Sequence, residues 1–204
     1  AARARAVNTI RLKVGTTTEL VGDNTDGIGL IHDLADNLQV AIEGTKILVL
    51  GAGGATRGVV GPLLEQKPEE LVIANRTPER AAELAAEFGA LGHVRGVGFD
   101  AIDGGPYDLV INATSAGLQG DVPPVPGATV GARTVCYDMA YAKGETPFTR
   151  WAREHRAAAA YKGWGMLVEQ AAEAFQLWRG EQPDTAPVLA ALRRRAAMAA
   201  RSPS

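Results

Sequence analysis

Apolar residues fall into short blocks along the chain, and several blocks have the pattern of strands buried on both faces of a parallel sheet. Lys46–Leu50 is apolar after its lysine, and glycines lie close to both of its ends. Leu71–Ala74 and Asp108–Asn112 have a similar pattern, and Arg133–Asp138 predicts a further strand. The pattern over Val94–Val97 predicts only a weak strand.

Helical patterns alternate with these strands. Residues 55–66 follow the first strand, and Pro78–Phe88 begins with a proline, which is tolerated in the first turn of a helix. Later, Trp164–Trp178 places apolar residues three and four apart, and residues 186–200 predict a final Ala- and Arg-rich helix. Strands that alternate with helices predict an α/β fold with a parallel sheet and right-handed crossovers.

The first part of the chain has a different pattern. Two short extended runs, Ala6–Ile10 and Glu19–Gly22, flank a turn of the sequence Gly-Thr-Thr-Thr. The turn and cap residues Asp23–Gly27 follow, and apolar residues then recur at helical spacing from Ile31 to Leu38. This segment therefore predicts two extended runs joined by a turn, and then a helix.

A glycine-rich turn connects the first predicted strand of the sheet to the next helix. Glycine permits the tight turn and lets backbone N–H groups reach a pyrophosphate, and the helix N-terminus adds a partial positive charge. Thr56 stands where the usual pattern has a third glycine, so a plain strand-to-helix turn is the alternative. The residues predicted to bind the phosphates are Gly51, Ala52, Gly53, Gly54 and Ala55.

The end of the second strand favours NADP over NAD. An NAD site usually has Asp or Glu here to bind the ribose hydroxyls, whereas this chain has Asn75, Arg76 and Thr77. Arg76 offers a guanidinium group to a 2′-phosphate, and Arg80 lies one helical turn further on. The alternative is that both arginines are ordinary surface charges.

Four other polar residues each have two interpretations. Asp26 precedes a helix, so it is either an N-cap or a catalytic group. Gln170 lies on or beside the apolar face of its helix and needs a partner from backbone, water or ligand. Asn8 is a turn residue or a ligand contact, and Tyr141 lies just beyond a strand end, where open α/β sheets bind ligands.

Composition and charge exclude several classes of protein. The 204 residues are 46% hydrophobic and 22% charged, which is typical of a soluble globular chain and not of a disordered chain or a membrane protein. The net charge of −2 argues against a nucleic-acid-binding protein. The three consecutive arginines at 193–195 are assigned to a solvated helix face. The single cysteine, Cys136, excludes a disulfide framework, and the three histidines lack metal-ligand spacing, so no metal site is predicted.

Seven short motifs together resemble the shikimate dehydrogenase family, in the order in which that family has them. Several of them are weak alone, but seven in the right order are highly specific. They extend from about Val7 to the last helix, which is nearly the whole chain. The motifs are Val7-Asn8-Thr9, Asn24-Thr25-Asp26-Gly27, Gly51-Ala52-Gly53-Gly54-Ala55, Asn75-Arg76-Thr77, Asn112-Ala113-Thr114, Tyr137-Asp138-Met139 with Tyr141, and Gly165-Met166-Leu167-Val168-Glu169-Gln170-Ala171.

The resemblance implies a Rossmann-type parallel sheet with flanking helices, plus the remnant of a second, substrate-binding α/β lobe. We expect residues 1–25 to be that remnant, residues 26–163 to form the NADP-binding domain, and helices in 164–204 to return to the substrate lobe. The family reduces 3-dehydroshikimate to shikimate with NADPH, in the chorismate route to aromatic amino acids. The resemblance implies a cytoplasmic oxidoreductase with a small-molecule substrate, as a monomer or homodimer, without membrane or nucleic-acid partners.

The resemblance also implies roles for particular residues. Asn8, Asp26, Tyr141 and Gln170 would contact shikimate, and Asp26 would be half of a catalytic Lys–Asp pair. The cofactor NADP(H) would be held by Gly51–Ala55 at the pyrophosphate, by Asn75, Arg76, Thr77 and Arg80 at the adenosine 2′-phosphate, and by Met139 and Gly163 at the nicotinamide.

The chain departs from the family at its start. The family's catalytic lysine, in a segment of the type Asn-Val-Thr-x-Pro-x-Lys, and its paired serines for the substrate carboxylate would precede Ala1. Lys13 and Lys46 do not lie in such a segment. We therefore expect that the chain begins within a longer sequence and that these 204 residues alone bind NADPH but turn over shikimate poorly or not at all. Two alternatives are an NAD-dependent quinate/shikimate dehydrogenase and a nucleotide-binding module without catalysis.

Overall fold

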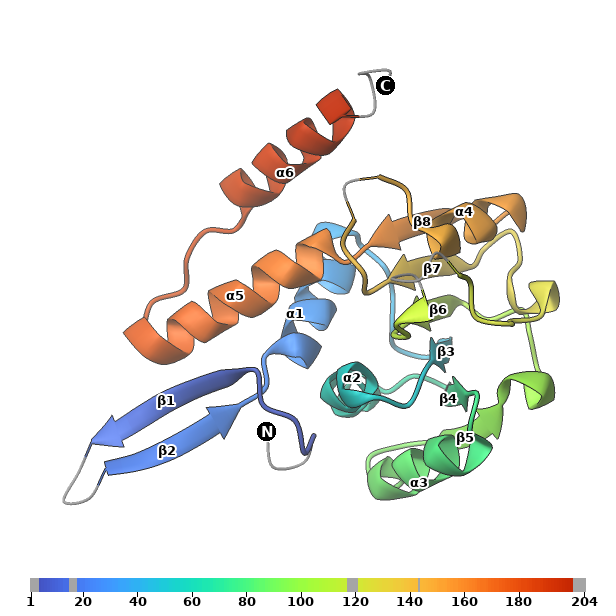
Figure 1. Ribbon diagram of the computed structural model, residues 1–204, viewed down its shortest axis with the longest axis horizontal. Helices are drawn as coiled ribbons and strands as arrows, with labels where there is room; N and C mark the ends of the chain where they lie inside the picture. The colour runs from blue at the N-terminus through green and yellow to red at the C-terminus, as the bar shows by residue number, and fades with distance from the viewer. Residues whose placement is uncertain (1–3, 15–17, 117–120, 143, 200–204) are drawn as a thin grey trace.

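The computed structural model describes residues 4–14, 18–116, 121–142 and 144–199, and its main feature is one sheet with helices on both faces (Figure 1). A separate two-stranded hairpin lies to one side of it. The strands are β1 Thr9–Val14, β2 Thr18–Asp23, β3 Lys46–Leu50, β4 Glu70–Asn75, β5 Val94–Gly98, β6 Leu109–Asn112, β7 Val135–Asp138 and β8 Ala159–Lys162. The α-helices are α1 Asp26–His32, α2 Gly54–Glu65, α3 Pro78–Phe88, α4 Pro147–Glu154, α5 Trp164–Arg179 and α6 Ala186–Ala199.

The main sheet has the strand order β5-β4-β3-β6-β7-β8, and each of these neighbouring pairs is parallel. The order reverses between β3 and β6, as it does in a doubly wound Rossmann-type sheet. Because the strands are parallel, their carboxyl ends reach the same edge, and ligands of such sheets bind there, where the order reverses. The predicted α/β fold with a parallel sheet is therefore confirmed.

One face of the sheet is covered by α1, α2, α3 and the start of α5. Ile47 and Val49 of β3 belong to one apolar cluster with Leu30 of α1, Leu63 of α2 and Leu84 of α3. Each of these side chains is at most 1% exposed. Burial of a side chain of this size contributes about 1.5–3 kcal/mol, so the cluster fixes α1 firmly against the sheet.

The opposite face is covered by α4 and by loop segments. Leu48 and Leu50 of β3 pack in a second cluster with Phe148 and Ala152 of α4. Cys136 of β7 belongs to the same cluster and has no exposed surface, which confirms its prediction as a core residue. The central strands are thus buried on both sides.

Helix α5 connects the helices of the sheet to the hairpin. It packs closely along α1, because a Cβ atom at Gly29 of α1 would lie 2.6 Å from the backbone nitrogen of Gln170. Near the other end of α5, the indole nitrogen of Trp178 donates a hydrogen bond to the Ile10 carbonyl over 3.0 Å. The assignment of residues 1–25, 26–163 and 164–204 to two lobes stays a prediction.

Most of the predicted elements are confirmed. The first predicted extended run, Ala6–Ile10, was wrong in its bounds, because strand β1 is Thr9–Val14 and its pairing with β2 extends to Val14. Lys46–Leu50 and Pro78–Phe88 are β3 and α3 with the predicted bounds, whereas the helix after Asp26 ends in a π-helical turn, Asp33–Asn37. Most of the predicted Gly-Thr-Thr-Thr turn lies outside the described residues.

Two elements, α4 and β8, were absent from the prediction. Strand β8 lies at the edge of the sheet and has only four residues, so it has no long apolar run. Helix α4 begins with a capping box of Thr146 and Thr149, a Thr–Thr pair in place of the usual Glu or Gln at the third position.

Burial predicts that the only cysteine of the sequence is unreactive in the folded protein. Desolvation raises the pKa of the Cys136 thiol to about 12, and the thiolate is the nucleophilic form. We expect no reaction with 5,5′-dithiobis(2-nitrobenzoate) at about pH 8, and one equivalent of released thionitrobenzoate after unfolding in guanidinium chloride. Equal reaction rates for the native and the unfolded protein would contradict this.

Candidate functional site

The site begins where β3 and β6 leave the sheet. Gly51 follows β3 with a φ of +101°, a left-handed conformation that favours glycine. A Cβ atom at this position would also lie 3.2 Å from the Ala113 carbonyl oxygen, in the loop after β6. The two loops therefore meet at the point where the strand order reverses.

The predicted phosphate-binding turn lies open at the start of a helix. Helix α2 begins at Gly54, and a Cβ atom at Gly53 or Gly54 would meet nothing within 4 Å. A side-chain hydrogen bond holds the turn in place, because the buried Thr56 hydroxyl donates to the Gly51 carbonyl over 2.9 Å. Thr56 thus supports the turn from the position of the third glycine. Gly51, Ala52, Gly53, Gly54 and Ala55 lie together at the N-terminus of a twelve-residue helix, which suits an anion.

The end of β4 presents its basic residues to solvent. Asn75 donates from its side chain to the Thr77 carbonyl over 3.0 Å, which shapes the turn into α3. Arg76 and Arg80 are exposed, and neither forms an ion pair within the part of the chain that the structure describes. Arg76 also lines an open hollow of about 600 Å³ with Phe99 of the segment after β5.

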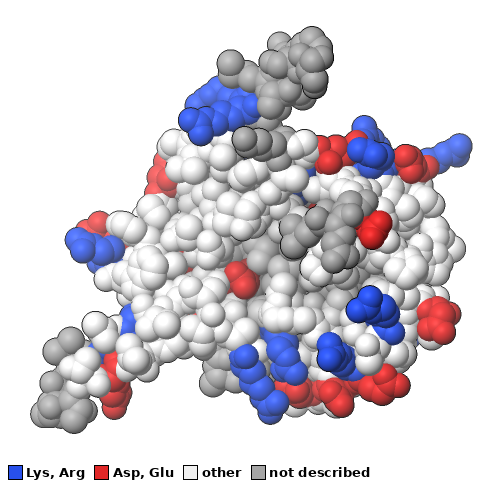
Figure 2. Space-filling view, in the orientation of Figure 1, with Lys and Arg blue, Asp and Glu red and all other residues white. Residues whose placement is uncertain are grey.

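Charged side chains of both signs gather along the lower edge of the face in Figure 2, around α3, while the centre of that face is largely uncharged. This face therefore carries charges of mixed sign and no broad basic surface. This arrangement agrees with the net charge of −2.

The loop after β7 carries Met139 and Tyr141, and a buried carboxylate holds it. Asp138 accepts hydrogen bonds from the Asn112 side chain (3.0 Å), the Ala140 backbone N–H (3.1 Å) and the Thr146 hydroxyl (2.6 Å). Burial raises the pKa of the Asp138 carboxyl, and these hydrogen bonds oppose the shift. Asp138 thus joins the ends of β6 and β7 to the start of α4. The sequence predictions do not include Asp138 as a site residue, although a carboxylate at the end of an apolar strand indicates one.

Met139 and Gly163 lie against each other, while their role at the nicotinamide stays a prediction. Gly163 is the N-cap of α5, and its backbone N–H donates to the Ala140 carbonyl over 3.1 Å. A Cβ atom at Gly163 would be 2.5 Å from the Met139 carbonyl oxygen. The loop after β7 and the start of α5 are therefore packed as one surface.

Three of the four predicted substrate residues are brought together by Thr25. The Asn8 amide donates to Asp26 Oδ1 over 2.8 Å, and its oxygen accepts from the Thr25 backbone N–H over 3.0 Å. The Thr25 hydroxyl donates to Gln170 Oε1 over 3.2 Å. Among the described residues no donor reaches Asp26 Oδ2, so this oxygen is available to a ligand. The N-cap residue of α1 is Thr25, and Asp26 is the first residue of the helix.

Tyr141 lies apart from this group. The residue is 56% exposed, and its ring contacts Trp164, with ring centroids 5.7 Å apart. No hydrogen bond in the described part of the chain joins it to Asn8, Asp26 or Gln170. Its role as a substrate contact stays a prediction.

Two further classes of feature are absent from the described residues. They contain no group of three or more His, Cys, Asp or Glu side chains that could hold a metal ion. None of the helices in this part of the chain has the length and apolar character needed to cross a membrane.

Comparisons with known proteins place these features in a family. Residues 33–118 match the family described as Shikimate / quinate 5-dehydrogenase, and residues 163–193 match the Shikimate 5'-dehydrogenase C-terminal domain. Over 192 residues the chain is 56% identical to a shikimate dehydrogenase (NADP(+)) of Methylococcus capsulatus, covering 94% of this chain and 68% of that protein.

Solved structures agree with the sequence matches. An Ael1 enzyme from Pseudomonas putida is 45% identical with a TM-score of 0.83, over 94% of this chain and 69% of that chain. The shikimate 5-dehydrogenase of Thermus thermophilus, solved in complex with NADP(H) and shikimate, is 35% identical with a TM-score of 0.79. That match covers 95% of this chain and 70% of the other.

The Asp138 contacts predict the effect of an isosteric change. In Asp138→Asn an amide N–H₂ replaces one acceptor oxygen and faces donors, so we expect the free energy of unfolding in urea to fall by about 1–3 kcal/mol. Asp36→Asn at an exposed position is the matched control and should leave stability unchanged. Equal midpoints of urea unfolding for the two variants would show that the Asp138 hydrogen bonds do not stabilise the fold.

Proposed function

The chain belongs to the shikimate dehydrogenase family, and from this premise we propose that it catalyses the reversible, NADP-dependent reduction of 3-dehydroshikimate to shikimate. The relative from Thermus thermophilus was solved with both of these ligand types, NADP(H) and shikimate. The proposed partners are thus small molecules. Cytoplasmic placement and a monomeric or homodimeric state are part of the same proposal.

The observation that carries the proposal is the convergence of Asn8, Asp26 and Gln170. They come from the segment before β1, from the start of α1 and from α5, yet hydrogen bonds through Thr25 connect them. A polyhydroxylated ring needs fixed donors and acceptors at several positions. This group supplies a carboxylate oxygen and two amide side chains whose orientations are set by their neighbours.

The residues at the carboxyl edge of the sheet fit NADP(H). The open N-terminus of α2 at Gly53 and Gly54 leaves room for a phosphate against backbone N–H groups, and the exposed Arg76 and Arg80 suit a 2′-phosphate. We propose that Asn75 and Thr77 complete the adenosine side and that Met139 and Gly163 line the nicotinamide pocket. When bound, the cofactor supplies the hydride that adds to the carbonyl carbon.

The chain's own residues would orient the substrate and hold a proton donor. Asn8 fixes Asp26 Oδ1, which leaves Oδ2 to accept a hydrogen bond from the lysine that the family pairs with this aspartate. A lysine ammonium held in this way donates its proton to the reacting oxygen during reduction. Gln170 would bind a ring hydroxyl, and Tyr141 would also contact the substrate.

The test is an assay of the intact gene product with shikimate and NADP⁺, followed by absorbance of NADPH at about 340 nm. We expect turnover in wild type and a loss of about 10²–10⁴-fold in kcat for Asp26→Asn. NADP⁺ binding without turnover would instead support a nucleotide-binding module without catalysis. Faster turnover of quinate with NAD⁺ would support the NAD-dependent alternative.

Cofactor selectivity gives a separate prediction. Removing a charged donor to a phosphate costs about 1.5–3 kcal/mol, so Arg76→Ala should raise the Michaelis constant for NADP⁺ about 10- to 100-fold. Activity with NAD⁺, which lacks the 2′-phosphate, should not fall. Arg133→Ala is the matched control, because Arg133 is exposed but lies before β7 at the opposite edge of the sheet. An equal loss with both cofactors would refute a role for Arg76 at the 2′-phosphate.

A further inference from the structure

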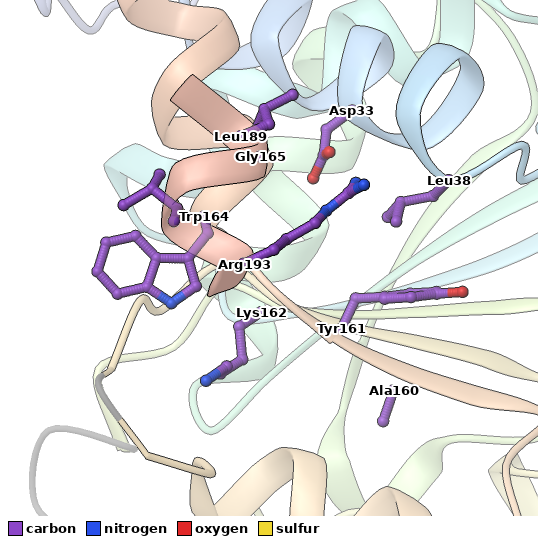
Figure 3. A pocket seen from close by; sticks show the side chains of 10 residues that line it. Asp33, Leu38, Ala160, Tyr161, Lys162, Trp164, Gly165, Leu189 and Arg193 are labelled. Carbon is purple, nitrogen blue, oxygen red and sulfur yellow. The ribbon is translucent and has the colours of Figure 1, made fainter. Parts of the chain in front are cut away.

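Asp33 is a buried carboxylate at the place where three elements meet. It lies at the end of α1, is 3% exposed, and accepts a 2.6 Å hydrogen bond from the Tyr137 hydroxyl of β7. It also faces the first turn of α5, where Gly165 lies beside its carboxylate in Figure 3. Any Cβ atom at position 165 would overlap the Asp33 oxygens, so only glycine permits this approach.

The Asp33 carboxylate lies against the first turn of α5, next to the Met166 backbone N–H, which donates to the Tyr137 hydroxyl over 3.4 Å. The N-cap residue of that helix is Gly163, which has no side chain to bind the free backbone N–H groups of the first turn. A carboxylate is favourable at a helix N-terminus because it interacts with the helix dipole. The contact thus anchors the start of α5 to the end of α1 and, through Tyr137, to the sheet.

A chain of hydrogen bonds extends from Asp33 into the helices. The Asn37 amide donates both to Asp33 Oδ1 (3.2 Å) and to Glu169 Oε1 of α5 (2.9 Å). The Thr185 hydroxyl, at the start of α6, donates to the same Glu169 oxygen over 2.9 Å. Burial raises the pKa of the Asp33 carboxyl, with the nearby Glu169 adding to the shift, while Tyr137 and Asn37 oppose it. Burying a carboxylate costs folding free energy, so its presence here indicates a role beyond packing.

The three elements that meet at Asp33 each carry a residue of the proposed site. Asp26 begins the helix that ends beside Asp33, about 10 Å away along the axis at 1.5 Å per residue. Gln170 lies five residues after Gly165 on α5, and Met139 lies two residues after Tyr137. Helices α1 and α5 run in opposite directions, since Gly165 touches Asp33 while Gln170 touches Gly29.

We propose that Asp33 is a positioning residue that fixes the substrate-binding pair Asp26 and Gln170 relative to the nicotinamide side of the site. This inference rests on the proposed function. Asp33 itself is remote from the reacting atoms and acts through the orientation of α1, α5 and the end of β7. Loss of the Asp33 contacts lets the substrate shift against the cofactor, while the phosphate-binding turn and Arg76 keep their places.

The experiment compares Asp33→Ala, Asp33→Asn and Tyr137→Phe in the intact gene product. We expect kcat to fall about 10- to 100-fold for Asp33→Ala, the scale of a small positioning error, with NADP⁺ affinity unchanged. The isotope effect with NADPH deuterated at the transferred position should rise, because hydride transfer becomes slower than product release. Asp33→Asn keeps one acceptor oxygen and should recover part of the rate.

A matched control separates positioning from stability. Thr134→Val removes a buried 2.6 Å hydrogen bond, from the Thr134 hydroxyl to the Tyr107 carbonyl, just before the amino end of β7. It should lower the melting temperature but leave kcat and the isotope effect as in wild type. The double variant that combines Asp33→Asn with Tyr137→Phe should lose less kcat than the product of the two single-variant losses, because the two side chains share one hydrogen bond.

The outcomes distinguish this inference from the proposed function. Absence of turnover in wild type refutes the proposed function. In that case shikimate affinity, measured by calorimetry, tests the inference on its own. We expect Asp33→Ala to bind shikimate more weakly than Thr134→Val does. An Asp33→Ala protein with the wild-type isotope effect and shikimate affinity overturns the positioning role. Equal losses of NADP⁺ and shikimate affinity also overturn it, because they indicate general damage to the fold.

Discussion

The central strands are buried on both faces, and this constraint decides where polar chemistry can lie. Helices cover one side of β3 and β6, and α4 with its neighbouring loops covers the other, so an unpaired polar side chain within these strands would lose its hydrogen bonds to water. Polar residues appear where the strands end instead. The last residues of β4, β6, β7 and β8 are Asn75, Asn112, Asp138 and Lys162, all at the same edge.

The site proposed at that edge has two kinds of binding surface. The cofactor side is made of contiguous segments, a strand end followed by a turn and a helix start, as at Gly51–Ala55 and Asn75–Arg80. The proposed substrate side is made of segments distant in sequence, which meet through helix packing and through hydrogen bonds to Thr25. Thr25 and Gln170 are 145 positions apart, and their contact depends on the close approach of α1 and α5 at Gly29. Precision on the substrate side therefore depends on helix packing, and on the cofactor side it depends on turn geometry.

This difference explains what could be predicted from the sequence. Lys46–Leu50, the glycine-rich turn and Pro78–Phe88 follow from local patterns, and the structure has them as expected. Local sequence left Asp26 and Gln170 undecided, because their partners are far away in the chain. Asp33 lies on the same helical face as Leu30 and Leu34, so the local pattern does indicate its burial. Its partner Tyr137, which is 104 positions away, could not be inferred from any local pattern.

The buried cysteine makes the protein convenient for spectroscopy. Because Cys136 lies in the core with its pKa raised to about 12, the folded protein offers no competing thiol to a maleimide dye. A cysteine introduced on the exposed face of α6 or on the hairpin would be labelled alone, without removal of the native one. A pair of such labels would report distances between the hairpin and the main sheet in solution, with and without nucleotide.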